Sequence, residues 1–261
     1  MRRERAPVAI VLLAALGVAF FVLPLLGLVV RTPWGDAARE LASPASLDAL
    51  RLSLVASLSA TAVALVLGVP LAWLYARVEF PGRAVLRALT TLPMVLPPVV
   101  GGVALLLAFG RRGLLGGWLA DIGITLPYTT AGVVMAETFV AMPFLVLTVE
   151  AGLRSMDLRY EEAARTLGAG RWKVFWRVTV PMIAPSLVAG AVLCWARALG
   201  EFGATITFAG NFPGVTQTMP LAVYLQLEGG DPQASFVLSL VLLAISVAVL
   251  VGLRHRWLGT P

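Results

Sequence analysis

Long apolar runs separated by short polar segments dominate this chain. We predict six membrane spans at about 8–30, 52–76, 92–109, 127–152, 183–208 and 234–253. A helix needs about 20 apolar residues to cross the hydrocarbon core of a bilayer. The runs are continuous, whereas the strands of a membrane barrel alternate with a period of two. The pattern therefore predicts an all-α integral membrane protein with six transmembrane helices.

The spaces between the predicted spans are too short for a soluble domain, so we expect residues 1–261 to form a single transmembrane domain. The longest segments outside the predicted spans are 153–182 and a loop at about 209–233. The apolar run from Val8 to Val30 is too long for the core of a cleaved signal peptide, so we interpret it as the first span. Prolines within the spans favour a packed bundle, where neighbouring helices satisfy the freed carbonyls.

Composition supports a membrane protein and excludes several chemistries. The chain is 59% hydrophobic and 13% charged, whereas a soluble domain carries about 25% charged residues. Cys194 is the only cysteine and His255 the only histidine, which excludes an intrachain disulfide and argues against a metal cluster or histidine-based catalysis. The sequence contains no P-loop motif for nucleotide binding.

The basic residues predict the orientation in the membrane. If the N-terminus is cytoplasmic, the basic residues on the cytoplasmic side are Arg2, Arg3, Arg5, Arg77, Arg83, Arg87, Arg154, Arg159, Arg165, Arg171, Lys173, Arg177, Arg254 and Arg256. The opposite side then holds Arg31, Arg39, Arg51, Arg111 and Arg112. Since basic residues accumulate in cytoplasmic loops, this asymmetry places both termini and the segment 153–181 in the cytoplasm.

Residues 160–181 form a polar, arginine-rich island within this apolar sequence. We predict a helix over 159–167, a turn at Gly168 and Gly170, and a second short helix over 171–178. Pro181 is expected in the first turn of the next span. One interpretation of the exposed aromatic and basic residues is a helix that docks in a groove of another protein. The alternative is an amphipathic loop anchored to lipid headgroups.

The spacing of residues within the island favours the first interpretation. Glu162-Ala163-Ala164, three residues, Gly168, nine residues and Val178-x-Val180-Pro181 resemble the EAA signature of ATP-binding cassette (ABC) importer permeases. The family form is EAA-x3-G-x9-I-x-L-P, and this chain departs from it by valine at both aliphatic positions. The resemblance implies a type I ABC importer permease fold. It also implies that the loop couples the permease to a separate ATPase through Glu161, Glu162, Ala163, Ala164, Gly168, Trp172, Val178, Val180 and Pro181.

The resemblance further implies the assembly in which the chain works. The expected partners are a second copy of the chain, two ABC ATPase subunits, an extracytoplasmic binding protein and the lipid bilayer, with no nucleic acid. This chain would be a non-catalytic transport subunit without a cofactor, because ATP and Mg would be bound by the partner ATPase. The implied location is the cytoplasmic membrane of a bacterium or archaeon.

A second resemblance concerns the substrate. The stretch 197–224 is similar to the branch of these permeases that serves sulfate and molybdate, and 211–221 is closer to the molybdate or tungstate type. The segments 96–102 and 109–113 also look molybdate-like. The alternatives are a sulfate or thiosulfate ABC permease and a secondary anion transporter driven by an ion gradient, with Glu137, Arg197 or Glu201 as coupling groups.

Charged residues within the spans have two interpretations. Arg197 and Glu201 are four residues apart on one helix face and can pair, which would order the bundle. Alternatively, Arg197 provides positive potential along an anion path. Our candidate pathway or gate residues are Arg197, Gly200, Glu201, Asn211, Thr216 and Gln217. For Glu137 we favour a structural role in packing over contact with another subunit.

Overall fold

The structure is a computed structural model that describes residues 7–257, without the side chains of 250 and 253–257. Every regular element in this range is helical. The elements are α1 (Val8–Arg31), α2 (Trp34–Leu41), α3 (Pro44–Arg77), α4 (Arg83–Thr91), η1 (Leu92–Met94), α5 (Pro98–Phe109), α6 (Gly116–Asp121), α7 (Thr130–Ser155), α8 (Arg159–Thr166), α9 (Arg171–Val174), η2 (Phe175–Thr179), α10 (Val180–Met182), α11 (Ala184–Leu199), α12 (Gly203–Phe208), α13 (Met219–Glu228) and α14 (Pro232–Trp257).

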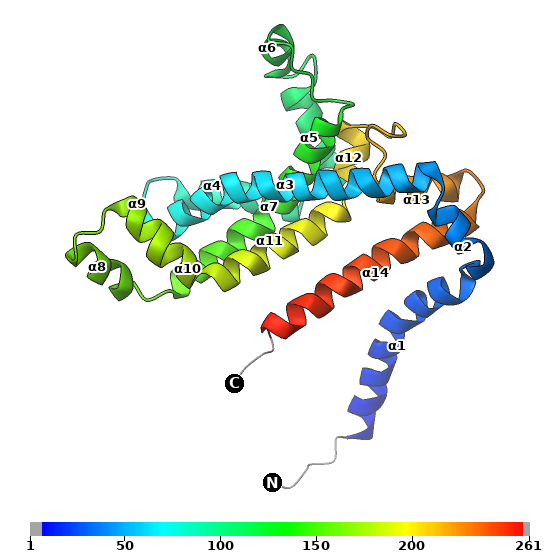
Figure 1. Cartoon of the computed structure of the whole chain (residues 1–261), viewed down its shortest axis with the longest axis horizontal. Helices are drawn as coiled ribbons and strands as arrows, with labels where there is room; N and C mark the ends of the chain where they lie inside the picture. The colour runs from blue at the N-terminus through cyan, green and yellow to red at the C-terminus, as the bar shows by residue number, and fades with distance from the viewer. Residues whose placement is uncertain (1–6, 258–261) are drawn as a thin grey trace.

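The centre of the fold is a bundle of α3, α7 and α11 (Figure 1). The Thr138 hydroxyl donates to the Ala60 carbonyl at 3.4 Å, and the Arg154 side chain donates to the Tyr75 carbonyl at 3.2 Å. These contacts join residues 78 and 79 positions apart, so α3 and α7 run parallel. Helix α11 runs antiparallel to α7, since Gly152 lies near Ser186 and Gly190 near Leu145.

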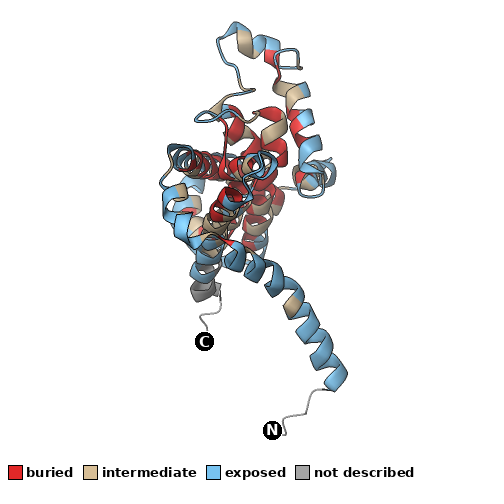
Figure 2. Ribbon diagram, turned by 90° about the vertical axis from the view of Figure 1, so that its right-hand side faces the viewer, coloured by how far each residue is buried: buried red, intermediate tan, exposed pale blue. Residues whose placement is uncertain are grey.

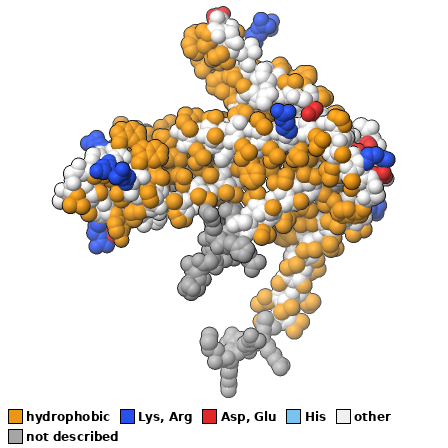
Figure 3. All heavy atoms as spheres, viewed as in Figure 1, with side chains coloured by type: hydrophobic (Ala, Val, Ile, Leu, Met, Phe, Trp, Pro, Cys, Tyr) orange, Lys and Arg blue, Asp and Glu red, His pale blue; other side chains and the backbone are white. Residues whose placement is uncertain are grey.

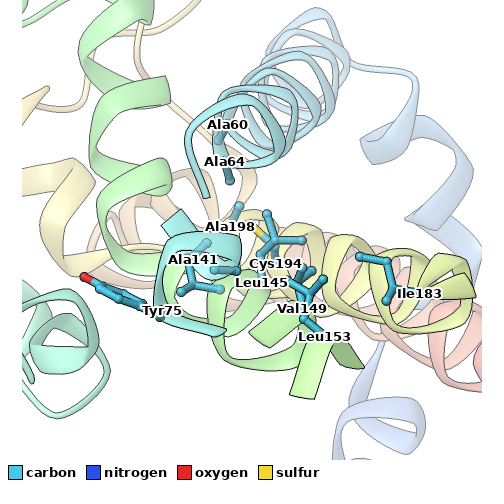
Figure 4. Packing of buried hydrophobic residues seen from close by; sticks show 12 residues of the cluster. Ala60, Ala64, Tyr75, Ala141, Leu145, Val149, Leu153, Ile183, Cys194 and Ala198 are labelled. Atoms are coloured by element: carbon cyan, nitrogen blue, oxygen red, sulfur yellow. The ribbon is translucent and has the colours of Figure 1, made fainter. Parts of the chain in front are cut away.

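Small side chains let these three helices approach one another closely. Figure 4 shows Ala60 and Ala64 of α3 beside Ala141 of α7 and Cys194 and Ala198 of α11, all fully buried. Larger residues complete the cluster toward one end of the bundle: Tyr75, Leu145, Val149, Leu153 and Ile183. Lipid tails are as apolar as the helices, so association in a membrane depends on packing of this kind.

The parallel direction of α3 and α7 requires the chain to run back between them. The segment that returns is bent by 118° between residues 83–94 and 98–109. The predicted span 92–109 is therefore not one continuous helix, because Leu92–Met94 continue from α4 and α5 begins at Pro98. Pro93, Pro97 and Pro98 explain the break, since proline lacks the amide hydrogen that continues a helix.

The predicted span 183–208 is also interrupted. Helix α11 ends at Leu199 and α12 begins at Gly203, and residues 171–182 meet α11 at 73°. Pro181 lies in α10, before this bend, and Pro185 occupies the first turn of α11 that we expected for Pro181. Proline is tolerated there because the first amides of a helix have no partner within it.

The remaining spans agree better with prediction. Helices α1, α3, α7 and α14 are long and apolar enough to cross a membrane, and the two bent pairs raise the possible number to six. Helix α3 begins eight residues before the predicted start at 52. Figures 2 and 3 show the buried interior of the bundle and its apolar outer surface, and α1 buries none of its residues. Arg2, Arg3 and Arg5, used to predict orientation, lie outside the described residues.

Close contact between α5 and α12 generates a first prediction. A Cβ atom at Gly102 would lie 2.6 Å from the Thr207 Cβ and 2.9 Å from the Ala204 carbonyl oxygen. Gly102→Leu should therefore lower the free energy of unfolding by about 1–3 kcal/mol through overpacking. The matched control is Gly17→Leu in α1, where nothing lies within 4 Å. Thermal unfolding in detergent checks this, and equal melting temperatures for both variants would contradict the proposed packing.

Candidate functional site: the polar loop

The polar loop, residues 156–182, lies at one end of the bundle (Figure 1). The predicted helix–turn–helix is confirmed, with α8 followed by a turn and then α9. The Gly168 amide donates to the Arg165 carbonyl at 2.9 Å, and the Ala169 amide donates to the Ala164 carbonyl at 3.0 Å. These two bonds close the end of α8 in a Schellman motif. Gly168 has φ +83°, a conformation that glycine adopts without the steric cost of a side chain.

Glu161 joins three elements of this region. Its side chain is buried although its neighbours on α8 are exposed. The Thr179 hydroxyl of η2 donates to Glu161 Oε1 at 2.8 Å, and Arg77 Nη2 at the end of α3 lies 3.4 Å from the same oxygen. Arg165 Nη2 lies 3.4 Å from Oε2. This carboxylate therefore fixes α8 to the end of α3 and to the segment that leads to α11.

Glu161 and Glu162 differ in what they can contact. Glu162, Ala163 and Gly168 are exposed, and Ala164 is half-buried. These residues form the outer face of α8 and its turn, where another protein can reach them, and Glu162 also lines a concavity between α8, α9 and the end of α3. Glu161 faces inward and positions α8. Our sequence analysis missed Arg77 and Thr179, because the contact with Arg77 spans 84 positions and no local pattern marks it.

A concavity of about 390 Å³ lies between α8, α9 with η2, and the end of α3. Its lining includes Trp73, Arg77, Glu161, Arg171 and Phe175. Four residues of the segment formed by α9 and η2 line the concavity, namely Arg171, Val174, Phe175 and Thr179. Their side of the segment therefore faces α8 and α3. The remaining sides of the segment carry exposed Trp172 and Trp176.

The segment after the turn contains a local widening of the helix. Residues Phe175–Thr179 adopt a π-helical turn directly before Val180 and Pro181. A proline inside a helix clashes with the carbonyl four residues earlier, and a π-turn is one way in which a helix accommodates a disruption of its hydrogen bonding. Val178 and Val180 are half-buried, and Pro181 is exposed.

A second ionic cluster lies near the same end of the bundle. Glu150 of α7 is 1% exposed, and its carboxylate is 3.1 Å from Arg87 Nε of α4 and 2.8 Å from Arg154 Nη2. Arg154 also binds the Tyr75 carbonyl, and the Tyr75 hydroxyl is 2.7 Å from the Thr90 hydroxyl. Glu150 therefore has two cationic partners, and the cluster holds α4 against the ends of α3 and α7.

The predicted Arg197–Glu201 pair is confirmed, with 2.6 Å between Arg197 Nη1 and Glu201 Oε2. Glu201 is buried, and its Oε1 accepts from the Ala204 amide at 2.8 Å. This bond satisfies an amide in the first turn of α12, where a negative charge is also favourable. The geometry favours the ordering role. Arg197 retains 28% side-chain exposure, and Gly200 is exposed.

The other pathway candidates are less accessible than the sequence indicates. Thr216 and Gln217 are buried, and the Thr216 hydroxyl accepts from the Phe212 amide at 2.9 Å. Asn211 is half-buried, so the exposed part of this loop is Phe212–Val215. Glu137 is buried within α7, and its Oε2 has no hydrogen-bond partner among the described residues, so its packing role stays a prediction.

Among the side chains that the structure describes, no group of three or more histidine, cysteine, aspartate or glutamate residues is placed to hold a metal ion. The long apolar helices and the exposed polar loop together define a multi-pass membrane protein whose polar loop lies at one end of a helical bundle.

Comparison with known proteins then identifies the family. Residues 64–259 match the family described as the binding-protein-dependent transport system inner membrane component. Because this match covers more than half of the chain, the protein belongs to that family. It is a multi-pass membrane permease and a transport subunit, not an enzyme.

Individual relatives cover nearly the whole chain. The molybdenum transport system permease protein ModB of Mycobacterium tuberculosis is 46% identical over 93% of this chain and 92% of its own length. The sulfate transport system permease protein CysT of Escherichia coli is 37% identical over 89% of this chain and 85% of its own. A bacterial ABC transporter involved in alginate import has the same fold, with a TM-score of 0.73, 20% identity and coverage of 97% and 95%.

The two glutamates of α8 provide a matched test. Glu161→Ala leaves Arg77 and Thr179 without their shared acceptor, so we expect a loss of about 1–3 kcal/mol in the free energy of unfolding. Glu162→Ala changes an exposed side chain and should stay within about 0.5 kcal/mol of the parent protein. Thermal unfolding with limited proteolysis of the polar loop measures both, and equal effects would contradict the positioning role of Glu161.

Proposed function

We propose that this protein is the permease subunit of an ATP-driven importer that carries molybdate or tungstate into the cytoplasm. The observation that carries the proposal is the 46% identity to a molybdenum permease over nearly the full length of both chains. The sulfate permease is less similar, at 37%. This difference supports molybdate over sulfate.

We propose that the outer face of α8 is the surface that couples the permease to its ATPase. The EAA spacing supports this role, and so does the exposure of Glu162, Ala163 and Gly168. Glu161 would hold α8 rigidly to α3. Movement of an ATPase against α8 would then reach the bundle through Glu161 and through the continuous segment 171–182. Trp172, Val178, Val180 and Pro181 would belong to this connection.

The proposed assembly contains two permease copies, two ATPase subunits and an external binding protein. The family description supports the binding protein. ATP and Mg would be bound by the ATPase subunits. We propose six membrane crossings in a single domain, with both termini cytoplasmic, because the parallel pair α3 and α7 needs a return crossing between them. The exposed loop Phe212–Val215 at the opposite end of the bundle would meet the binding protein.

The transport cycle would alternate between states open to either side. A nucleotide shifts such an equilibrium only by its difference in affinity for the two states. Transmission of the ATPase movement to the bundle would also require rigid attachment of α8, because a loosely attached loop would move without moving the bundle. Within the membrane, we propose that Arg197 lies beside the anion path while Glu201 limits its charge.

The two glycines of the turn test the coupling surface. Gly168→Val places a β-branched side chain at φ +83° and should distort the end of α8. We expect weaker co-purification with the ATPase and about tenfold less molybdate-stimulated ATP hydrolysis in liposomes, equivalent to about 1.4 kcal/mol. Gly170→Val is the control, because Gly170 has φ −65° and nothing lies within 4 Å of its Cβ position. Normal assembly and hydrolysis in Gly168→Val would count against the proposal.

Substrate and energy source can be tested together. Liposomes that contain the permease, its ATPase and the binding protein should accumulate molybdate only with internal ATP. Excess tungstate should compete, and excess sulfate should compete weakly. Uptake driven by an ion gradient without ATP would instead support the secondary transporter, and stronger competition by sulfate would support the sulfate permease.

A further inference from the structure

Residues 171–182 run across the bundle and not along it. This segment meets α11 at 73°, and α11 packs along α3 and α7, which are long enough to cross a membrane. With α3, α7 and α11 as the proposed membrane crossings, a segment bent by 73° from α11 would lie closer to the plane of the membrane than to its normal. It is also joined to α11 by Ile183 alone, which keeps it at the depth where this crossing begins.

The two sides of the segment differ in chemistry. Arg171, Val174, Phe175 and Thr179 line the concavity toward α8 and α3. Trp172, Lys173, Trp176 and Arg177 are exposed, and Trp172 and Trp176 are 75% and 60% accessible. The Phe175 ring packs edge-on against both tryptophan rings, with centroids 6.3 and 5.2 Å away. The aromatic pair is therefore supported from within the loop but uncovered on its outer side.

The charge on this outer side is entirely positive. Residues 171–177 read RWKVFWR and contain no acidic residue. Within the described part of the chain, Lys173 and Arg177 form no salt bridge, unlike Arg165 and Arg77 on the side facing the concavity. Tryptophan favours the membrane interface, and lysine and arginine favour anionic headgroups.

We propose that Trp172, Lys173, Trp176 and Arg177 form a membrane-anchoring face that binds anionic phospholipid headgroups. The face would hold residues 171–182 at the bilayer surface while α8 remains in the aqueous phase. It would keep this segment at a constant depth in the bilayer while movement of α8 passes along it to α11. This inference goes beyond the proposed ATPase contact and does not depend on it, because it requires only that the bundle lies in a bilayer.

The test measures contact between the two tryptophans and lipid. The full-length protein is placed in vesicles in which either phosphatidylglycerol or phosphatidylcholine carries brominated acyl chains, which quench nearby tryptophan. The difference between the parent protein and a Trp172→Phe/Trp176→Phe variant isolates the two side chains. We expect stronger quenching by phosphatidylglycerol, because attraction of one cation to an anionic surface corresponds to about fivefold enrichment.

Two controls make the result specific. Lys173→Gln/Arg177→Gln should retain quenching and lose the preference for phosphatidylglycerol. Trp34 is 63% exposed on α2, which carries Asp36, Arg39 and Glu40. The difference in quenching between the parent protein and Trp34→Phe should therefore be equal for phosphatidylglycerol and phosphatidylcholine.

Equal quenching of Trp172 and Trp176 by both lipids would overturn the proposal. Protection of these tryptophans from lipid quenching when the ATPase subunit is added would overturn it as well, because the face would then dock on protein. Neither result decides whether Gly168 is needed for ATPase assembly, so failure of this inference and failure of the proposed function can be distinguished.

Discussion

Close packing of small side chains between α3, α7 and α11 is the constraint on which the rest of the fold depends. Ala60, Ala64 and Ala141 bring two long helices into contact in a parallel direction. Parallel neighbours cannot be joined by a short turn, so the intervening chain has to travel back. The bent segment 83–109, the cluster around Glu150 and the close contact of Gly102 with α12 all follow from that return.

Three of the carboxylates that are buried by the packing of the helices have partners that compensate their charge. Buried carboxylates are costly unless they are paired or hydrogen-bonded. Glu150 and Glu161 meet this condition near the end of the bundle that carries the polar loop, where each links helices far apart in the sequence. Glu201 meets it between α11 and α12 by pairing with Arg197 and accepting from an amide of α12. Each of these carboxylates links helices through ion pairs or hydrogen bonds. The contacts of Glu161 with Arg77 and Thr179 attach α8, and with it the exposed face of this helix, to the bundle.

Much of the fold could be predicted because hydropathy reports directly on crossing a bilayer. The helices α1, α7 and α14 match the predicted spans closely, and the turn at Gly168 follows from the special conformation that glycine allows. The breaks at 95–97 and 200–202 were not predicted. A run of apolar residues has the same hydropathy whether it is straight or bent, so its length does not reveal a bend at Pro97 or a cap at Glu201.

The sequence by itself determined the class of protein, the family signature from Glu162 to Pro181 and the polar character of the loop. These features depend on composition and on spacing along the chain. Only the tertiary structure separated the buried Glu161 from the exposed Glu162 and brought Arg77 and Thr179 to the same carboxylate. It also turned Trp172 and Trp176 away from the concavity. Adjacent residues on a helix point in different directions, and which direction is buried depends on neighbours that are distant in the sequence.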